Sequence, residues 1–62
     1  MPLSKDELKK LATDIKAAED NLTVALADIA KAKRAGIDVT DNEKTALELK
    51  EKIRKIKAAY LL

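Results

Sequence analysis

The chain lacks the residue types on which most catalytic and metal chemistry depends. Its 62 residues include no cysteine and no histidine, which excludes disulfides, thiolate chemistry and the usual zinc sites. With one glycine and one tyrosine, it also has no glycine-rich loop and few groups that serve as nucleophile or base. We therefore expect a protein that is not an enzyme and that uses no metal or other cofactor.

The charge and hydropathy of the chain are balanced. Its 13 basic and 11 acidic residues give a formal net charge of +2, which is too even to indicate a nucleic-acid or membrane partner. No stretch approaches the roughly 20 apolar residues of a spanning helix, and the first residues lack the apolar core of a secretory signal. These patterns predict a soluble cytoplasmic protein with no membrane span.

The segment from Ser4 to Ala35 has the pattern of an amphipathic helix. Ser4 and Glu7 have the spacing of a capping box, in which each side chain accepts a hydrogen bond from the backbone N–H of the other residue. Apolar residues then recur every three or four positions along one stripe. This seam comprises Leu8, Leu11, Ile15, Leu22, Leu26 and Ile29, flanked by Ala12, Ala18, Ala25, Ala30 and Ala32. The stripe ends before Gly36, a residue suited to the left-handed conformation that closes a helix.

The segment from Thr40 to Leu62 repeats this pattern. Thr40 and Glu43 again have the spacing of a capping box, and the seam continues through Ala46, Leu49, Ile53, Ile56 and Tyr60. The short connector between the two segments favours antiparallel neighbours. We predict an all-α fold, an antiparallel, coiled-coil-like two-helix hairpin. It forms a single domain over 1–62, with helices at about 5–35 and 41–61 and a turn at 36–40.

The two predicted helices differ in length. At 1.5 Å per residue, the first projects beyond the second by about 13 Å, so Leu8 and Leu11 are expected to lack cover from the second helix. In the register set by the turn, Glu19 is expected to form a salt bridge beside the seam with Lys57. An uncovered apolar end favours association with another helix.

A second group of apolar residues is predicted on the face of the second helix opposite its seam: Leu47, Ala58 and Leu61. With Leu8 and Leu11 they form our candidate interface, although isolated apolar residues are also ordinary on protein surfaces. We expect the hairpin to complete a helical bundle by self-association, as a dimer above all, or to bind another helical protein.

The length and hairpin plan resemble the small plasmid copy-control proteins that bind RNA as dimers forming a four-helix bundle. This resemblance is architectural, with no shared motif, and it implies a dimer. The sequence thus predicts a structural or protein-interaction module, such as a small assembly or adaptor protein of the phage or plasmid type.

A different function is suggested by the basic run in the second helix, whose cations are Lys50, Lys52, Arg54, Lys55 and Lys57. Basic amphipathic helices bind phosphates, so a nucleic-acid-binding hairpin is the alternative. However, these cations point around most of the helix, and Tyr60 is the only aromatic residue that could stack on a base. We therefore favour a solvated face.

Overall fold

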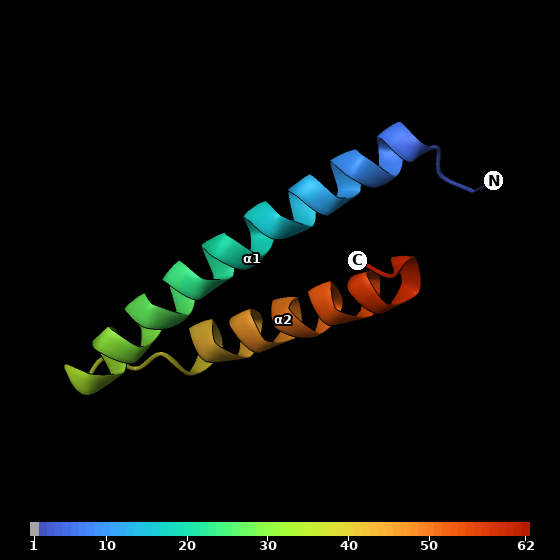
Figure 1. The fold of residues 1–62 in the computed structure, drawn as a ribbon. Helices are drawn as coiled ribbons and strands as arrows, with labels where there is room; N and C mark the ends of the chain where they lie inside the picture. The colour runs from blue at the N-terminus through green and yellow to red at the C-terminus, as the bar shows by residue number, and fades with distance from the viewer. Residues whose placement is uncertain (1) are drawn as a thin grey trace.

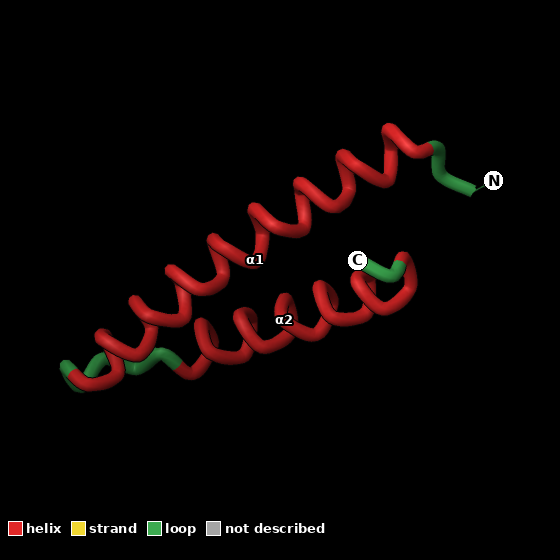
Figure 2. The backbone as a smooth tube through the Cα atoms, viewed as in Figure 1, coloured by secondary structure: helices red, strands yellow, loops and turns green. Residues whose placement is uncertain are grey.

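In a computed structural model that describes residues 2–62, the chain forms two antiparallel α-helices. Helix α1 spans Lys5–Arg34 and helix α2 spans Thr40–Tyr60. The helices pack against each other from the turn and separate toward the open end of the hairpin (Figure 1). The backbone tube shows no strand in this part of the chain (Figure 2). The predicted all-α hairpin is confirmed.

Helix α1 begins with the predicted capping box. The Glu7 backbone N–H donates to the Ser4 hydroxyl, and the Ser4 N–H donates to the Glu7 carboxylate, both at 3.1 Å. The hydrogen bond from the Ser4 backbone is the main cause that lowers the pKa of Glu7, because it stabilises the charged form. The start of α1 is therefore fixed by interactions among four consecutive residues.

Helix α1 ends at the predicted glycine. Gly36 has a φ of +84°, and its N–H donates to the carbonyl of Lys33 at 3.0 Å. The next N–H, from Ile37, donates to the carbonyl of Ala32 at 3.0 Å. This pair of hydrogen bonds is a Schellman motif, which reverses the chain immediately after α1.

The capping box predicted at the start of α2 is wrong. Val39 occupies the N-cap position, and no side chain makes a capping hydrogen bond to the helix N-terminus from there. The Asp38 carboxylate instead accepts hydrogen bonds from the Thr40 N–H at 3.0 Å and from its hydroxyl at 2.8 Å. The Thr40 backbone hydrogen bond is the main cause that lowers the pKa of Asp38. The Glu43 N–H, which the predicted threonine cap would have satisfied, donates to the Val39 carbonyl at 2.8 Å, so Thr40 is the first residue of the helix and not its cap.

The core is a single seam between the helices. Its buried residues are Ile15, Leu22, Ala46 and Ile53, with Leu11, Ala18, Leu26, Ile29 and Ile56 packed against them. Two predicted members of the seam, Leu49 and Tyr60, are exposed instead. No side chain among the described residues is completely buried, because two helices leave the seam open on both sides.

Val39 is a buried residue that the sequence analysis missed. It lies in the connector between the two helices. It nevertheless continues the seven-residue repeat that runs back from Tyr60 through Ile53 and Ala46, and this repeat is the signal that could have identified it. Val39 is therefore buried in the connector, outside the cluster that forms the seam.

The open end of the hairpin is better covered than expected. The backbone of Leu61 has the left-handed conformation, with a φ of 56°. The Leu62 N–H donates to the carbonyl of Lys57 at 2.9 Å. This turn directs the last residues back toward α1 (Figure 1), so Leu62 is 39% exposed and Leu61 is 93% exposed.

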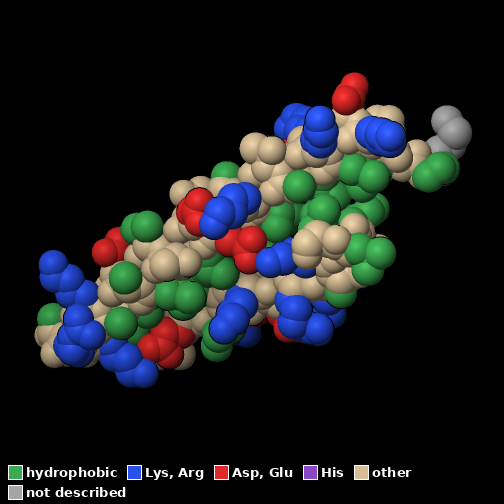
Figure 3. Space-filling model, in the orientation of Figure 1, with side chains coloured by type: hydrophobic (Ala, Val, Ile, Leu, Met, Phe, Trp, Pro, Cys, Tyr) green, Lys and Arg blue, Asp and Glu red, His purple; other side chains and the backbone are tan. Residues whose placement is uncertain are grey.

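The expectation that Leu8 and Leu11 lack cover is therefore wrong. Leu8 is half-buried, and Leu11 packs against the core. Apolar side chains gather between the helices at this end (Figure 3). Helix length alone does not predict this burial, because it leaves out the residues after α2, where the chain turns back toward α1.

Candidate interaction surface

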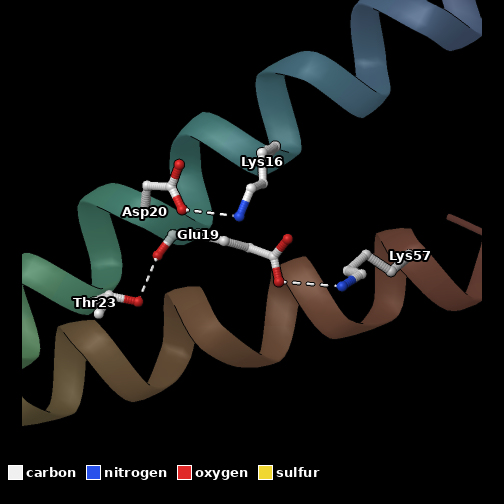
Figure 4. A network of polar contacts seen from close by, with 5 residues as sticks. All are labelled: Lys16, Glu19, Asp20, Thr23 and Lys57. Carbon is white, nitrogen blue, oxygen red and sulfur yellow. Dashed lines mark hydrogen bonds and ion pairs between the residues drawn. The ribbon is translucent and has the colours of Figure 1, made fainter.

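Two ion pairs join the helices and show which residues of α1 lie beside which residues of α2. Lys33 pairs with Glu43 at 3.0 Å, and Glu19 pairs with Lys57 at 3.1 Å, which confirms the predicted Glu19–Lys57 salt bridge. Figure 4 shows Glu19 reaching from α1 toward Lys57 on α2. The two pairs are fourteen positions apart on each helix. This spacing equals two heptads, and both pairs therefore follow the same side of the seam.

A groove on this side of the seam, which we call the Leu47 groove, is rich in charge. Leu47 is 60% exposed there. The other lining residues are Glu19, Leu22, Thr23, Leu26, Lys50, Glu51, Ile53, Arg54 and Lys57. Acidic and basic side chains cross the space between the helices on the face shown in Figure 3. Half of the lining residues are charged.

A second groove, which we call the Leu49 groove, lies on the other side of the seam. Two positions along a helix are about 200° apart around its axis, so Leu47 and Leu49 face different sides. The remaining lining residues are Asn21, Leu22, Ala25, Ile29, Asp41, Asn42, Thr45 and Ala46. Asp41 is the only charged residue in this lining. Leu49, which is 40% exposed, therefore lies in a lining with one charged residue.

The five predicted interface residues do not all lie in these grooves. Leu47 lines the groove that bears its name, at the edge of the seam and not opposite it as predicted. Ala58 and Leu61 are exposed on and just after α2, whereas Leu8 and Leu11 face the covered open end. Of the five, only Leu47 lines either groove.

The basic run of α2 is partly neutralised within the chain. Arg54 donates to the Glu51 carboxylate, and Lys57 pairs with Glu19. The hydrogen bond from Arg54 is the main cause that lowers the pKa of Glu51. The other three predicted contacts, Lys50, Lys52 and Lys55, are exposed and have no ion pair within residues 2–62.

The hairpin exposes more surface than a compact protein of its size. A folded monomer of 6.8 kDa has an accessible surface of about 4,000 Å², whereas this chain exposes 5237 Å². Its Cα radius of gyration is 14.6 Å, compared with about 11 Å for a compact chain of this length. The excess arises because two helices side by side leave both grooves open.

These features define an elongated antiparallel helical hairpin with two open grooves. Neither helix in the described part of the chain combines the length and apolar character needed to cross a bilayer. Within the same residues, no cluster of three or more acidic or other ligating side chains is placed to hold a metal ion. No protein-family model, curated protein or solved structure matches the chain.

Proposed function

We propose that this chain is a non-enzymatic protein-interaction module that acts as a helical oligomer. The excess exposed surface carries this proposal, because the hairpin leaves about 1,300 Å² more exposed than a compact monomer of its mass. A standard protein interface buries about 800 Å² on each partner. Association with another helical surface would therefore remove most of the excess.

The partial burial of the seam supports the same proposal. Leu26 and Ile29 pack against the core but are only half-buried, and each lines one of the two open grooves. In a four-helix bundle such residues form a common core, since two further helices close the open side. The hairpin has the architecture of half a bundle.

The test is the molecular mass of the purified chain in solution. We expect sedimentation equilibrium at micromolar concentrations to give a multiple of the 6.8 kDa chain mass. The thermal unfolding midpoint should rise with protein concentration, because association stabilises only the folded state. A well-folded monomer, with a midpoint independent of concentration up to about 100 times the initial value, contradicts the proposal.

A nucleic-acid-binding hairpin remains the second candidate because Lys50, Lys52 and Lys55 have no ion pair within residues 2–62. Salt separates the two functions. Nucleic-acid affinity falls steeply with ionic strength, since counterions are released on binding, whereas apolar association is maintained. If the chain shifts labelled RNA or DNA at low salt and releases it at higher salt while remaining monomeric, the second candidate replaces the first.

A further inference from the structure

We infer that a second copy of this chain occupies the Leu49 groove and that the Leu47 groove stays on the outside of the assembly. This inference rests on the proposed oligomer and specifies its contact surface. Of the predicted interface residues, Leu47, Ala58 and Leu61 would then lie outside the main contact. The Leu49 groove lies between α1 and α2, and its occupant closes the seam on that side.

The charges of the two linings distinguish the grooves. Five of the ten residues in the Leu47 groove are charged, compared with one of the nine in the Leu49 groove. The buried centres of protein interfaces are depleted in charged residues. Covering the Leu47 groove would also remove water from Arg54 and from the Glu19–Lys57 pair, and desolvating such groups is costly. The Leu49 groove is therefore better suited to burial.

The same charges determine whether each groove can face a copy of itself. In a twofold dimer the same patch contributes from both subunits. A pair of Leu47 grooves would bring the unpaired Lys50 of each copy to the same interface. A pair of Leu49 grooves would bring only Asp41 as a charged residue from each copy, and it would bury Ala25 and Leu49 from both, where the small alanine side chain allows close helix approach.

The exposed area favours one additional hairpin. The excess surface of about 1,300 Å² exceeds the roughly 800 Å² that each partner buries in a standard interface. A second copy offers a matching groove of the same length, because both are bounded by the same helices. Two copies joined in this way form a four-helix bundle that buries Leu49, the one large apolar residue exposed in this lining.

Two leucines on α2 provide a matched test. Leu49→Glu introduces a charge into the inferred contact, and Leu47→Glu introduces the same charge on the other side of the seam. We expect Leu49→Glu to weaken the dimer at least about thirtyfold in sedimentation equilibrium, because it places a charge where an apolar side chain is buried. Leu47→Glu should change the dissociation constant less than about threefold. The reverse order would overturn the inference and leave the proposed oligomer standing.

A second measurement does not depend on disrupting the assembly. Asn21 and Thr23 lie on α1 in the Leu49 and Leu47 grooves, respectively. The chain has no cysteine, so Asn21→Cys and Thr23→Cys each accept one spin label. We expect pulsed electron paramagnetic resonance to give a shorter distance between subunits for labels at position 21 than for labels at position 23.

A shorter distance at position 23 would contradict the choice of groove, even if Leu49→Glu simply fails to fold. Equal distances at both positions would contradict it too, because they would place neither groove at the contact. If the unsubstituted chain is a folded monomer, the proposed function fails and the inference fails with it. The oligomeric state and the distances therefore separate these two failures.

Discussion

The turn end and the open end of the hairpin are stabilised differently. At the turn, Gly36 supplies the left-handed residue, the Asp38 carboxylate binds the start of α2, and Val39 is buried. At the open end, Leu61 must adopt the left-handed conformation with a side chain that disfavours it. The helices also separate there (Figure 2). The turn is closed by local hydrogen bonds and a buried valine, whereas at the open end only the start of α1 is fixed locally, by its capping box, and the end of α2 depends on apolar packing.

The largest effect is expected at Val39, which tests whether packing at the turn matters as much as its hydrogen bonds. Val39→Ala should lower the free energy of unfolding by about 2 kcal/mol, since a buried valine side chain is shortened. Val24→Ala is the matched control, because Val24 is exposed on α1, and should change stability by less than about 0.5 kcal/mol. Urea unfolding at a fixed protein concentration, followed by circular dichroism, measures both. Equal losses would show that Val39 is not part of the core.

Substitutions at the two left-handed residues, Gly36 and Leu61, are expected to have an intermediate effect on stability. The effect should be of opposite sign at the two ends of the hairpin. Gly36→Ala should lower the free energy of unfolding by about 1 kcal/mol, because alanine disfavours the positive φ at this position. An added Cβ meets no atom within 4 Å, so no steric clash adds to this cost. Leu61→Gly should stabilise the hairpin by up to about 1 kcal/mol, because it removes the strain of a left-handed leucine.

Thermal unfolding at a fixed protein concentration measures this pair, with Leu62→Ala as the control at the open end. Leu62 is the better covered of the last two leucines, so shortening it should lower stability. If Leu61→Gly lowers the midpoint as well, the open end is not strained as described. The comparison between the ends would then fail.

The smallest effect is expected from pH. Glu7 at the open end and Asp38 at the turn both have pKa values lowered from their ordinary 4.5 and 3.8. The folded chain therefore binds fewer protons at these groups than the unfolded chain does. Their stabilisation is complete above those ordinary values and is lost as the pH falls through the lowered folded values. We expect the unfolding midpoint to fall as the pH decreases through this range.

Two substitutions assign that pH dependence to the two ends. Glu7→Gln and Asp38→Asn retain a hydrogen-bond acceptor and remove the titrating carboxyl. Each should reduce the slope of the unfolding midpoint against pH, because one of the two groups no longer releases a proton on folding. Slopes equal to that of the unsubstituted chain would show that these caps do not respond to pH.

The sequence predicted those features that depend on neighbouring residues or on the heptad repeat. The Ser4–Glu7 capping box, the turn at Gly36 and the Glu19–Lys57 pair are all present. The second capping box failed because the Glu43 N–H donates to the Val39 carbonyl, and the Thr40 hydroxyl donates to Asp38. The spacing of residues identifies groups that can form a hydrogen bond, but it does not show which of several possible partners is used.

The exposure of Leu49 was not predictable from periodicity. The repeat places Leu49 on the seam, but the seam between two helices is narrow, and Leu49 lies at its edge. The position of Leu47 is not predictable for a related reason, since a residue about 100° from the seam on a helical wheel can still border a groove. The groove linings follow from the distance and angle between the helices, which periodicity does not determine.

The antiparallel course of α1 and α2 places both chain ends at the same end of the molecule (Figure 1). A force that pulls these ends apart would therefore load the cross-helix contacts one after another instead of together. The Glu19–Lys57 pair would be loaded before the Lys33–Glu43 pair, which lies closer to the turn. The hairpin should accordingly unzip at low force from its ends and resist strongly only when its helices are sheared past one another.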